Sequence, residues 1–587
     1  MRRKALLCVV ALLALLPACA YRYSVAVEEK AVRSEVEFRK NVMIPMRDGV
    51  ELAANIALPD SEGEFPVIIV RTPYGKGNGE DDNGVYHAAR GYAFVIQDCR
   101  GTGKSGGEWH PGVHERVDGL DTHEWVLAQP WCNGTIGTTG GSYLGYTQWI
   151  VAPDAGDSLK AMFTIVPLID WHTNSGYIGG AMALGTMMGW GAEMLRPTEG
   201  EGAGIDLDNW DWDKAYRQLP LSTWDDVIGF EVPFLRDWVA HPTPDSYWAQ
   251  MSVLDRLDEV RIPNITLSGW FDIFVQQGLD HVSTVMKTSR SDVARRNQHL
   301  IIGPWGHGPN WFVGKVDFGS DAGLDVEDLS NRWFDHWLKG EDTGVEQLPP
   351  YRIFVMGRNE WRDEQEWPLE RTRYTPYYFH SGGSANSLNG DGTLSAVKPG
   401  EEPADSYVYN PDNPVPTNGG CLLFGEDFGP QDQTEVEKRE DVLVFTSDVL
   451  DEEVEVTGPV KVVLYAASST PDTDWTAKLV DVFPDGRPFN FCDGIIRARY
   501  RESADNPTLI EPGKMYRYEI DLWATSNVFL PGHRIRVEIS SSNFPRFDRN
   551  PNTGHEFGAD AELKKATQTI YHDAQHPSHV LLPVIPN

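Results

Sequence analysis

Ser142 is the residue of this sequence best placed to act as a nucleophile. It stands between glycines in residues 138–145 (TTGGSYLG), directly after a predicted strand at 135–139. A serine on the tight turn from a strand into a helix forms a nucleophile elbow, and glycines leave the room that such a turn needs. In the usual pattern the second glycine comes two residues after the serine, but Leu144 stands there. The stretch predicts acyl transfer through a covalent serine ester.

An acid and a histidine follow in the order that this chemistry requires. Residues 264–272 are a short apolar run ending in Asp272, and residues 299–307 are another, ending in His307 beside glycines. Catalytic groups of an open α/β sheet collect at the carboxyl ends of its strands. Serine, acid and histidine in this chain order are typical of α/β-hydrolases. The sequence therefore predicts a catalytic triad of Ser142, Asp272 and His307.

The elements that must position these residues alternate along the chain. Residues 65–70 and 92–97 are continuous apolar runs, as expected for strands buried on both faces, and residues 38–58 resemble a hairpin with an Asp-Gly turn. Strands that alternate with helices indicate a parallel sheet. We predict an α/β-hydrolase core in two parts, 35–167 and 257–345.

Two further regions have different patterns. Residues 168–256 are rich in Trp and Met and amphipathic, which predicts a helical cap inserted between the nucleophile and its acid. Residues 346–587 hold short alternating runs broken by Gly, Pro and Asn, of which 351–355 is the first. This pattern predicts an all-β sandwich.

Several motifs together resemble the bacterial cocaine-esterase (CocE/NonD) branch of the X-prolyl dipeptidyl-peptidase (S15) superfamily, related to α-amino-acid ester hydrolases and glutaryl cephalosporin acylases. In that branch the glycine stands three residues after the serine, as Gly145 does here. The resemblance runs from about residue 38 to the C-terminus. The motifs are 46–50 (MRDGV), 71–74 (RTPY), 97–101 (QDCRG), 142–149 (SYLGYTQW), 269–272 (GWFD), 303–307 (GPWGH) and 541–548 (SSNFPRFD).

The resemblance implies a fold and further site residues. The fold would be an α/β-hydrolase core with an inserted helical cap and a C-terminal β jelly-roll domain. The oxyanion hole would combine the Tyr74 hydroxyl with the backbone N–H of Tyr143, the residue after the nucleophile. Trp190 and Phe274 match residues that line the acyl pocket. A second cap tryptophan of that branch aligns with Ser175, so the acyl pocket is expected to be reshaped.

The predicted function is a serine hydrolase that cleaves carboxylic esters, or amides, of small molecules. The first alternative is an X-Pro dipeptidyl-peptidase, but that branch usually carries a sizeable extra N-terminal domain, and here only about twenty residues separate the predicted signal from the hydrolase core. A second alternative is an α-amino-acid ester hydrolase or acylase; such enzymes have carboxylates where Phe274 and Val275 stand. A non-enzymatic binding protein with an inactive core is the third, and the intact triad argues against it.

Composition limits the partners. The chain has 587 residues and a formal charge of −35, which repels phosphate backbones and excludes nucleic acid as the expected ligand. No motif predicts a cofactor or a metal site. A homodimer is compatible with the sequence. Outside the N-terminal segment the cysteines allow three disulfide pairings, which the sequence leaves open: Cys99, Cys132, Cys421 and Cys492.

The N-terminus predicts export from a bacterial cell. Residues 1–4 (MRRK) are basic, and residues 5–16 are an apolar run too short to span a bilayer. Cleavage after residue 20 would remove a simple signal peptide. Cleavage after residue 18 would leave Cys19 as a lipidated first residue, the protein's one predicted membrane contact. The expected location is periplasmic, lipid-anchored or secreted.

Overall fold

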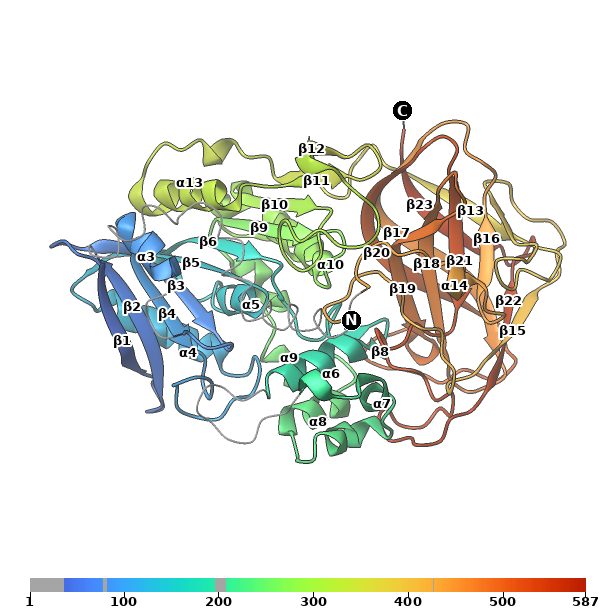
Figure 1. The fold of residues 1–587 in the computed structure, drawn as a ribbon, viewed down its shortest axis with the longest axis horizontal. Helices are drawn as coiled ribbons and strands as arrows, with labels where there is room; N and C mark the ends of the chain where they lie inside the picture. Colours follow the sequence, from blue (N-terminus) through green and yellow to red (C-terminus); the bar gives the residue numbers. More distant parts are fainter. Residues whose placement is uncertain (1–35, 78–81, 196–206, 426, 587) are drawn as a thin grey trace.

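The structure is a computed structural model that describes residues 36–586, apart from 78–81, 196–206 and 426. The predicted signal peptide and Cys19 lie outside the described residues. An α/β part and a β-sandwich lie side by side along the long axis of the molecule, and cap helices lie against both (Figure 1). This arrangement confirms the predicted fold class.

A ten-stranded sheet forms the α/β part, with strand order β1-β2-β4-β3-β5-β6-β9-β10-β11-β12. In this spatial order, all strands from β4 through β3 to β11 are parallel to one another. At one edge the β1–β2 hairpin pairs antiparallel with β4, and at the other edge β12 pairs antiparallel with β11. The strands are β1 (Val36–Pro45), β2 (Glu51–Pro59), β3 (Phe65–Thr72), β4 (Ala93–Asp98), β5 (Cys132–Gly141), β6 (Leu159–Ile165), β9 (Asn264–Gly269), β10 (Gln298–Gly303), β11 (Tyr351–Val355) and β12 (Glu360–Glu364).

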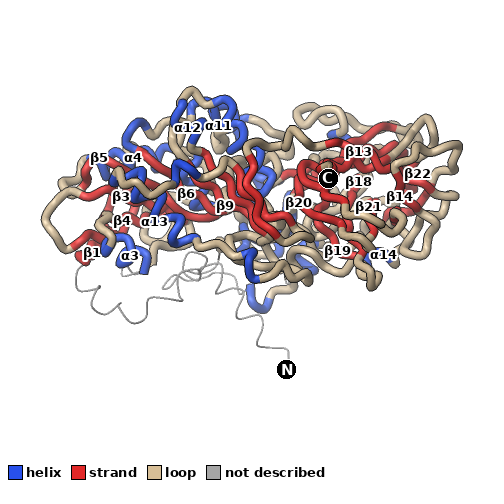
Figure 2. Tube along the Cα trace, turned by 90° about the horizontal axis from the view of Figure 1, so that it is seen from above, coloured by secondary structure: helices blue, strands red, loops and turns tan. Residues whose placement is uncertain are grey.

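Helices cover both faces of this sheet, with α3 and α13 on one side and α4, α11 and α12 on the other (Figure 2). The apolar strands are buried between them, as expected for a doubly covered parallel sheet. The helices are α3 (Asp82–Ala89), α4 (Glu115–Leu127), α5 (Tyr143–Trp149), α10 (Val275–Gln277), α11 (Ser283–Thr288), α12 (Asp292–Arg296) and α13 (Val326–Lys339).

The cap interrupts the sheet between β6 and β9 and joins it to the sandwich. Met182 and Asp548 exchange hydrogen bonds: the Met182 N–H donates to the carboxylate over 2.7 Å, and the Asp548 N–H donates to the Met182 carbonyl over 2.9 Å. The cap is therefore attached to the sandwich as well as to the core. Its elements are β7 (Tyr177–Ile178), β8 (Ala181–Met182), α6 (Leu184–Glu193), α7 (Trp212–Tyr216), α8 (Pro233–Ala240) and α9 (Ser246–Ala249).

The sandwich has an eleven-stranded, mostly antiparallel sheet system wrapped around a separate apolar core that includes Phe379, Trp475 and Ile520. One short helix, α14 (Thr434–Glu437), lies in a connection. The strands are β13 (Arg373–His380), β14 (Thr393–Ser395), β15 (Asp405–Tyr409), β16 (Leu443–Thr446), β17 (Val454–Ser468), β18 (Asp474–Val482), β19 (Pro488–Arg497), β20 (Tyr516–Phe529), β21 (Arg534–Ser540), β22 (Ala566–Tyr571) and β23 (His579–Ile585).

One strand was assigned to the wrong domain from sequence. Residues 351–355 were expected to begin the sandwich, but they form β11 of the α/β sheet, parallel to β10. The sandwich strands begin later, at β13. The physical reason is burial on both faces: four of the five residues of β11 are buried, as in a strand inside a parallel sheet.

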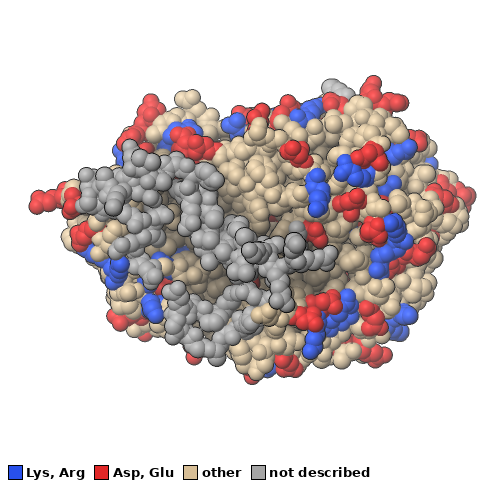
Figure 3. All heavy atoms as spheres, viewed as in Figure 1, with Lys and Arg blue, Asp and Glu red and all other residues tan. Residues whose placement is uncertain are grey.

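Three properties of the described residues bear on the remaining expectations. All four cysteines there are free and buried, so none of the three disulfide pairings is formed. None of their helices is long and apolar enough to cross a membrane. Acidic and basic side chains are interspersed over the coloured part of the face in Figure 3.

Candidate active site

Ser142 lies on a strained turn between β5 and α5. Its backbone angles are φ 58° and ψ −122°, a region that residues other than glycine rarely adopt. A Cβ on Gly140 would stand 2.5 Å from that of Leu144, and one on Gly145 would stand 2.7 Å from the Pro167 ring. The glycines at these two positions are therefore needed for the close approach, which is the geometry of a nucleophile elbow.

The predicted acid and base form a buried pair. His307 Nδ1 lies 2.5 Å from Asp272 Oδ2, and both side chains are almost fully buried. The other carboxylate oxygen, Oδ1, accepts the backbone N–H of Phe274 over 2.9 Å. Within the described part of the chain, His307 Nε2 is buried and has no hydrogen-bond partner. An imidazole oriented in this way can take up a proton at Nε2.

Gly269 allows the two loops that carry this pair to touch. A Cβ at this position would lie 2.2 Å from the carbonyl oxygen of Trp305. The Trp270 N–H donates to the Gly303 carbonyl over 2.9 Å, and the Phe271 N–H donates to the Trp305 carbonyl over 3.0 Å. These backbone bonds fix the two loops together, and with them the carboxylate and the imidazole.

Strand order explains why the predicted residues meet. Ser142 directly follows β5, Asp272 lies three residues after β9, and His307 lies four residues after β10. Tyr74 lies two residues after β3, the neighbour of β5. Because these strands are parallel, all four residues lie at one edge of the sheet.

Tyr74 is positioned as a neutral hydrogen-bond donor. Its hydroxyl oxygen accepts the indole N–H of Trp190 over 3.1 Å, which leaves the phenolic proton free to point elsewhere. Burial raises the pKa of Tyr74 to about 12, and hydrogen bonds with Trp190 and Ser142 lower it in part. The phenol therefore keeps its proton at neutral pH, next to the nucleophile.

Tyr143 begins helix α5, so its backbone N–H is one of the amides that a helix leaves without an internal partner. The side chain of Tyr143 has separate contacts: its hydroxyl donates to Glu115 over 2.9 Å. Glu115 forms a fully buried ion pair with Arg71 over 2.7 Å. Sequence reasoning did not identify this support, although Arg71 belongs to the RTPY motif; Glu115 stands in no motif that would have marked it.

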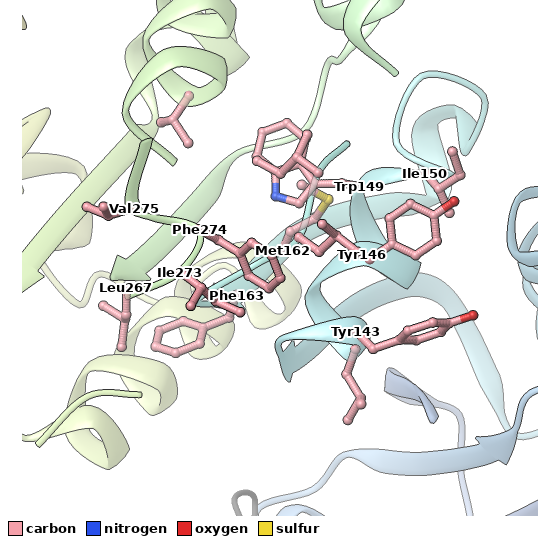
Figure 4. Packing of buried hydrophobic residues seen from close by; sticks show 14 of the residues in the cluster. Tyr143, Tyr146, Trp149, Ile150, Met162, Phe163, Leu267, Ile273, Phe274 and Val275 are labelled. Atoms are coloured by element: carbon pink, nitrogen blue, oxygen red, sulfur yellow. The ribbon is translucent and has the colours of Figure 1, made fainter. Parts of the chain in front are cut away.

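Trp190 and Phe274 each contact a predicted residue of the site. The Trp190 ring stacks on Tyr143 with centroids 5.8 Å apart, and the Phe274 ring meets the His307 ring edge-on at 5.5 Å. Figure 4 shows Ile273 and Phe274 on the segment after β9, with Tyr143 on α5. The two predicted pocket residues are thus brought to the edge of the sheet where the serine and histidine lie.

No group of three or more His, Cys, Asp or Glu side chains suited to a metal ion occurs among the described residues. The groups at this edge that could take part in a reaction are a hydroxyl, an imidazole held by a carboxylate, and a neutral phenol. Such a set can carry out acyl transfer.

Fold and site together define a serine hydrolase of the α/β-hydrolase class. Residues 48–309 match the X-Pro dipeptidyl-peptidase (S15 family), and residues 343–581 match the X-Pro dipeptidyl-peptidase C-terminal non-catalytic domain. The cocaine esterase of Rhodococcus sp. (strain MB1 Bresler) is 42% identical over 571 residues, covering 93% of this chain and 98% of that esterase. The chain belongs to the cocaine-esterase-like (CocE/NonD) hydrolases of the S15 superfamily.

Two solved structures are similar over nearly the whole chain. An aminopeptidase from the marine sediment archaeon Thaumarchaeota archaeon has a TM-score of 0.81 at 26% identity, covering 94% of this chain and 97% of its own. An α-amino acid ester hydrolase has a TM-score of 0.79 at 26% identity, with the same coverage. These similarities confirm the predicted family and fold. The chain is therefore a serine ester hydrolase by family.

Proposed function

We propose that Ser142, Asp272 and His307 act as the catalytic triad for hydrolysis of carboxylic esters. The observation that carries the proposal is the buried His307–Asp272 pair, 2.5 Å apart, at the same sheet edge as the strained Ser142. Ser142 Oγ attacks the ester carbonyl while His307 Nε2 takes its proton. Asp272 holds the imidazole through Nδ1 and stabilises the imidazolium that forms.

The remaining steps return the enzyme to its first state. The imidazolium gives its proton to the leaving alcohol, and the C–O bond of the ester breaks, which leaves the acyl group on Ser142. Water then attacks the acyl-enzyme, His307 takes a proton from it, and the acid is released as Ser142 regains its hydrogen.

We further propose that Tyr74 and Tyr143 form the oxyanion hole. The phenolic O–H of Tyr74 and the backbone N–H of Tyr143 would donate to the negative oxygen of the tetrahedral intermediate. The Trp190 bond to Tyr74 supports this role, because it occupies the acceptor side of the hydroxyl.

A covalent label tests the nucleophile directly. A fluorophosphonate probe should modify the wild-type protein at Ser142, as read by peptide mapping, and Ser142→Ala should neither react nor hydrolyse p-nitrophenyl butyrate. Ser222→Ala, at an exposed cap serine, is the matched control and should behave as wild type. Ser142→Ala protein that keeps more than about a tenth of the activity would refute the assignment.

The amine-bearing substrates named by the two solved relatives fit this site less well. A free ammonium group needs carboxylate partners when it is desolvated. The positions after the acid are the buried apolar residues Phe274 and Val275. Asp170, a nearby cap acid, already accepts the backbone N–H groups of His172 and Thr173. We therefore propose esters with an uncharged acyl group as substrates, and Trp190 and Phe274 as the walls of the acyl pocket.

We also propose that the protein is exported, as a lipoprotein anchored at Cys19 or as a secreted form beginning at Tyr21. The basic start and the short apolar run support export. Mass spectrometry of the mature N-terminus from the native host distinguishes the forms: a diacylated Cys19 indicates the lipoprotein, and a free Tyr21 indicates secretion. An intact Met1 would contradict both.

A further inference from the structure

The loop that carries Tyr74 contacts a buried carboxylate that the mechanism above does not use. Asp98 is the last residue of β4, and it pairs with Thr72, the last residue of the parallel neighbour β3. Tyr74 follows β3 by two residues. The strand pairing therefore places Asp98 beside the loop that presents the proposed oxyanion donor.

The Asp98 carboxylate accepts hydrogen bonds from three donors. Its Oδ1 accepts the backbone N–H of Lys76 over 2.6 Å, and its Oδ2 accepts the backbone N–H of Lys104 over 2.9 Å. The Lys76 ammonium lies 3.1 Å from Oδ2, and both side chains of this ion pair are almost completely buried. Lys76 is thus bound to Asp98 through its backbone and through its side chain, two residues after Tyr74.

Close packing fixes the orientation of this carboxylate. A Cβ on Gly103 would lie 2.3 Å from Asp98 Oδ2, so the chain at Gly103 passes directly against it. The Asp98 carbonyl also accepts the hydroxyl of Ser105 over 2.7 Å. Asp98 is therefore a rigid point from which the loop after β3 can be held.

The loop itself has little intrinsic rigidity. Gly75 and Gly77 stand on either side of Lys76, with φ angles of 90° and 71°. Glycine loses more conformational freedom on folding than any other residue, so such a segment needs contacts from elsewhere to keep one conformation. Asn55 gives two long bonds, to the carbonyls of Lys76 over 3.4 Å and Gly77 over 3.3 Å. The short, charge-assisted bonds to Asp98 are the stronger ones.

Tyr74 is held before its Cα, after it and at its tip. Its N–H donates to the Thr72 hydroxyl over 3.1 Å, its own hydroxyl accepts the Trp190 indole, and Asp98 holds the chain that follows. An oxyanion donor acts only within hydrogen-bond distance of the developing charge. A displacement of about 1 Å can cost on the order of 100-fold in rate.

The ion pair contributes geometry more than stability. Burying a carboxylate and an ammonium costs desolvation free energy that roughly offsets their attraction. What remains is direction, because the backbone and the ammonium of Lys76 can both reach Asp98 in only a narrow range of loop conformations.

We propose that Asp98, acting through Lys76, is a positioning residue for the oxyanion hole. It holds the loop after β3 so that the Tyr74 hydroxyl lies where the oxyanion forms. The inference rests on the proposed role of Tyr74 and adds to it the group that keeps this tyrosine in place. Because Asp98 acts on the donor of the transition state, its loss should lower kcat and leave KM nearly unchanged.

Asp98→Asn keeps the size of the side chain but has one accepting oxygen for the three donors. On p-nitrophenyl butyrate it should lower kcat by at least about tenfold, with KM within about threefold of wild type. A trifluoromethyl ketone forms a tetrahedral adduct with the serine whose oxygen occupies the oxyanion hole, so its inhibition should weaken by a similar factor. An unchanged kcat in folded Asp98→Asn protein, checked by circular dichroism, would overturn the inference.

A double-mutant cycle separates positioning from a merely structural role. In a Tyr74→Phe background, Asp98→Asn should lower kcat by less than about threefold, because the hydroxyl that it positions is already absent. An equal loss in both backgrounds would show that Asp98 does not act through Tyr74. The matched control is Asp481→Asn, at a buried sandwich aspartate paired with His533, which should leave kcat within about twofold in either background.

Lys76→Met provides a second variant should Asp98→Asn not fold. It removes the ammonium and keeps both backbone donors, so kcat should fall by about three- to tenfold, and by almost nothing in the Tyr74→Phe background. A wild-type kcat in Lys76→Met would then decide against the inference. Failure of the proposed oxyanion hole looks different, because Tyr74→Phe alone would then keep its activity.

Discussion

Trp190 of the cap donates its indole N–H to the hydroxyl oxygen of Tyr74, 3.1 Å away, and so links cap helix α6 to the loop after β3. This bond joins a residue expected to shape the acyl pocket with one expected to stabilise the oxyanion. If both proposed roles hold, we expect this bond to couple substrate recognition to transition-state stabilisation.

Tyr74→Phe should reduce kcat on p-nitrophenyl butyrate by on the order of 100- to 1000-fold, because one oxyanion donor is worth roughly 3–4 kcal/mol. The thermal unfolding midpoint should change little, since the ring is retained. A variant within about threefold of wild type would mean that the second donor lies elsewhere.

Trp190→Phe should have a smaller effect on kcat, about three- to thirtyfold, because the Tyr74 hydroxyl is kept but loses its orienting bond. In a Tyr74→Phe background the same change should have almost no further effect on kcat. Steady-state kinetics of the two single variants and the double variant form the test. Full additivity would show that Trp190 acts independently of Tyr74.

Asp272→Asn should lower kcat by about 10³- to 10⁴-fold, because an amide at this position favours the wrong imidazole tautomer. Labelling of Ser142 by fluorophosphonate should slow in parallel. Circular dichroism checks that the fold is intact. Activity within tenfold of wild type would exclude Asp272 as the residue that orients His307.

His87 gives a prediction for acid stability. Burial lowers the pKa of His87 to about 3, and its ring stacks on Phe94 with centroids 5.1 Å apart. The unfolded chain binds this proton below pH about 6.5, whereas the folded chain stays neutral down to about pH 3, so stability is lost as pH falls through this window. The loss from this residue is up to roughly 1.4 kcal/mol per pH unit.

His87→Phe should therefore flatten the decrease in unfolding free energy between pH 6.5 and pH 4. Urea denaturation at several pH values measures it. Ser222→Ala, at an exposed cap serine without a titratable group, is a control that should leave the slope unchanged. An unaltered slope in His87→Phe would show that this histidine does not contribute to acid unfolding.

Substrate preference is the most direct test of the ester proposal. With rates normalised to the uncatalysed reactions, p-nitrophenyl butyrate and a benzoate ester should exceed phenylglycine methyl ester and an X-Pro arylamide by at least about tenfold in kcat/KM, roughly 1.4 kcal/mol. The reason is that an ammonium would be desolvated beside Phe274 and Val275. A clear preference for either amine-bearing substrate would contradict the ester proposal. It would mean that cap acids such as Asp170 or Glu193 recognise the amine.

Much of this site could be predicted because its signals are local. Apolar runs ending in Ser142, Asp272 and His307 mark strand ends, and parallel strands bring such ends to one edge. Which sheet a strand joins is harder to predict, because it depends on a pairing strand that is distant in the sequence. Residues 351–355 have the same apolar pattern whether they pair with β10 or enter a sandwich. For the same reason no local signal marked Glu115, which forms its buried ion pair with the distant Arg71.

The late position of β11 and β12 has a consequence for synthesis of the protein. Every strand of the α/β sheet, and every residue of the proposed triad, lies upstream of Arg373, where the first sandwich strand begins. A growing chain can therefore complete the sheet and bring Ser142, Asp272 and His307 together before the sandwich has been translated. Asp548 of the sandwich is translated much later, so the proposed nucleophile can be in place before the cap gains its hydrogen bonds with the sandwich.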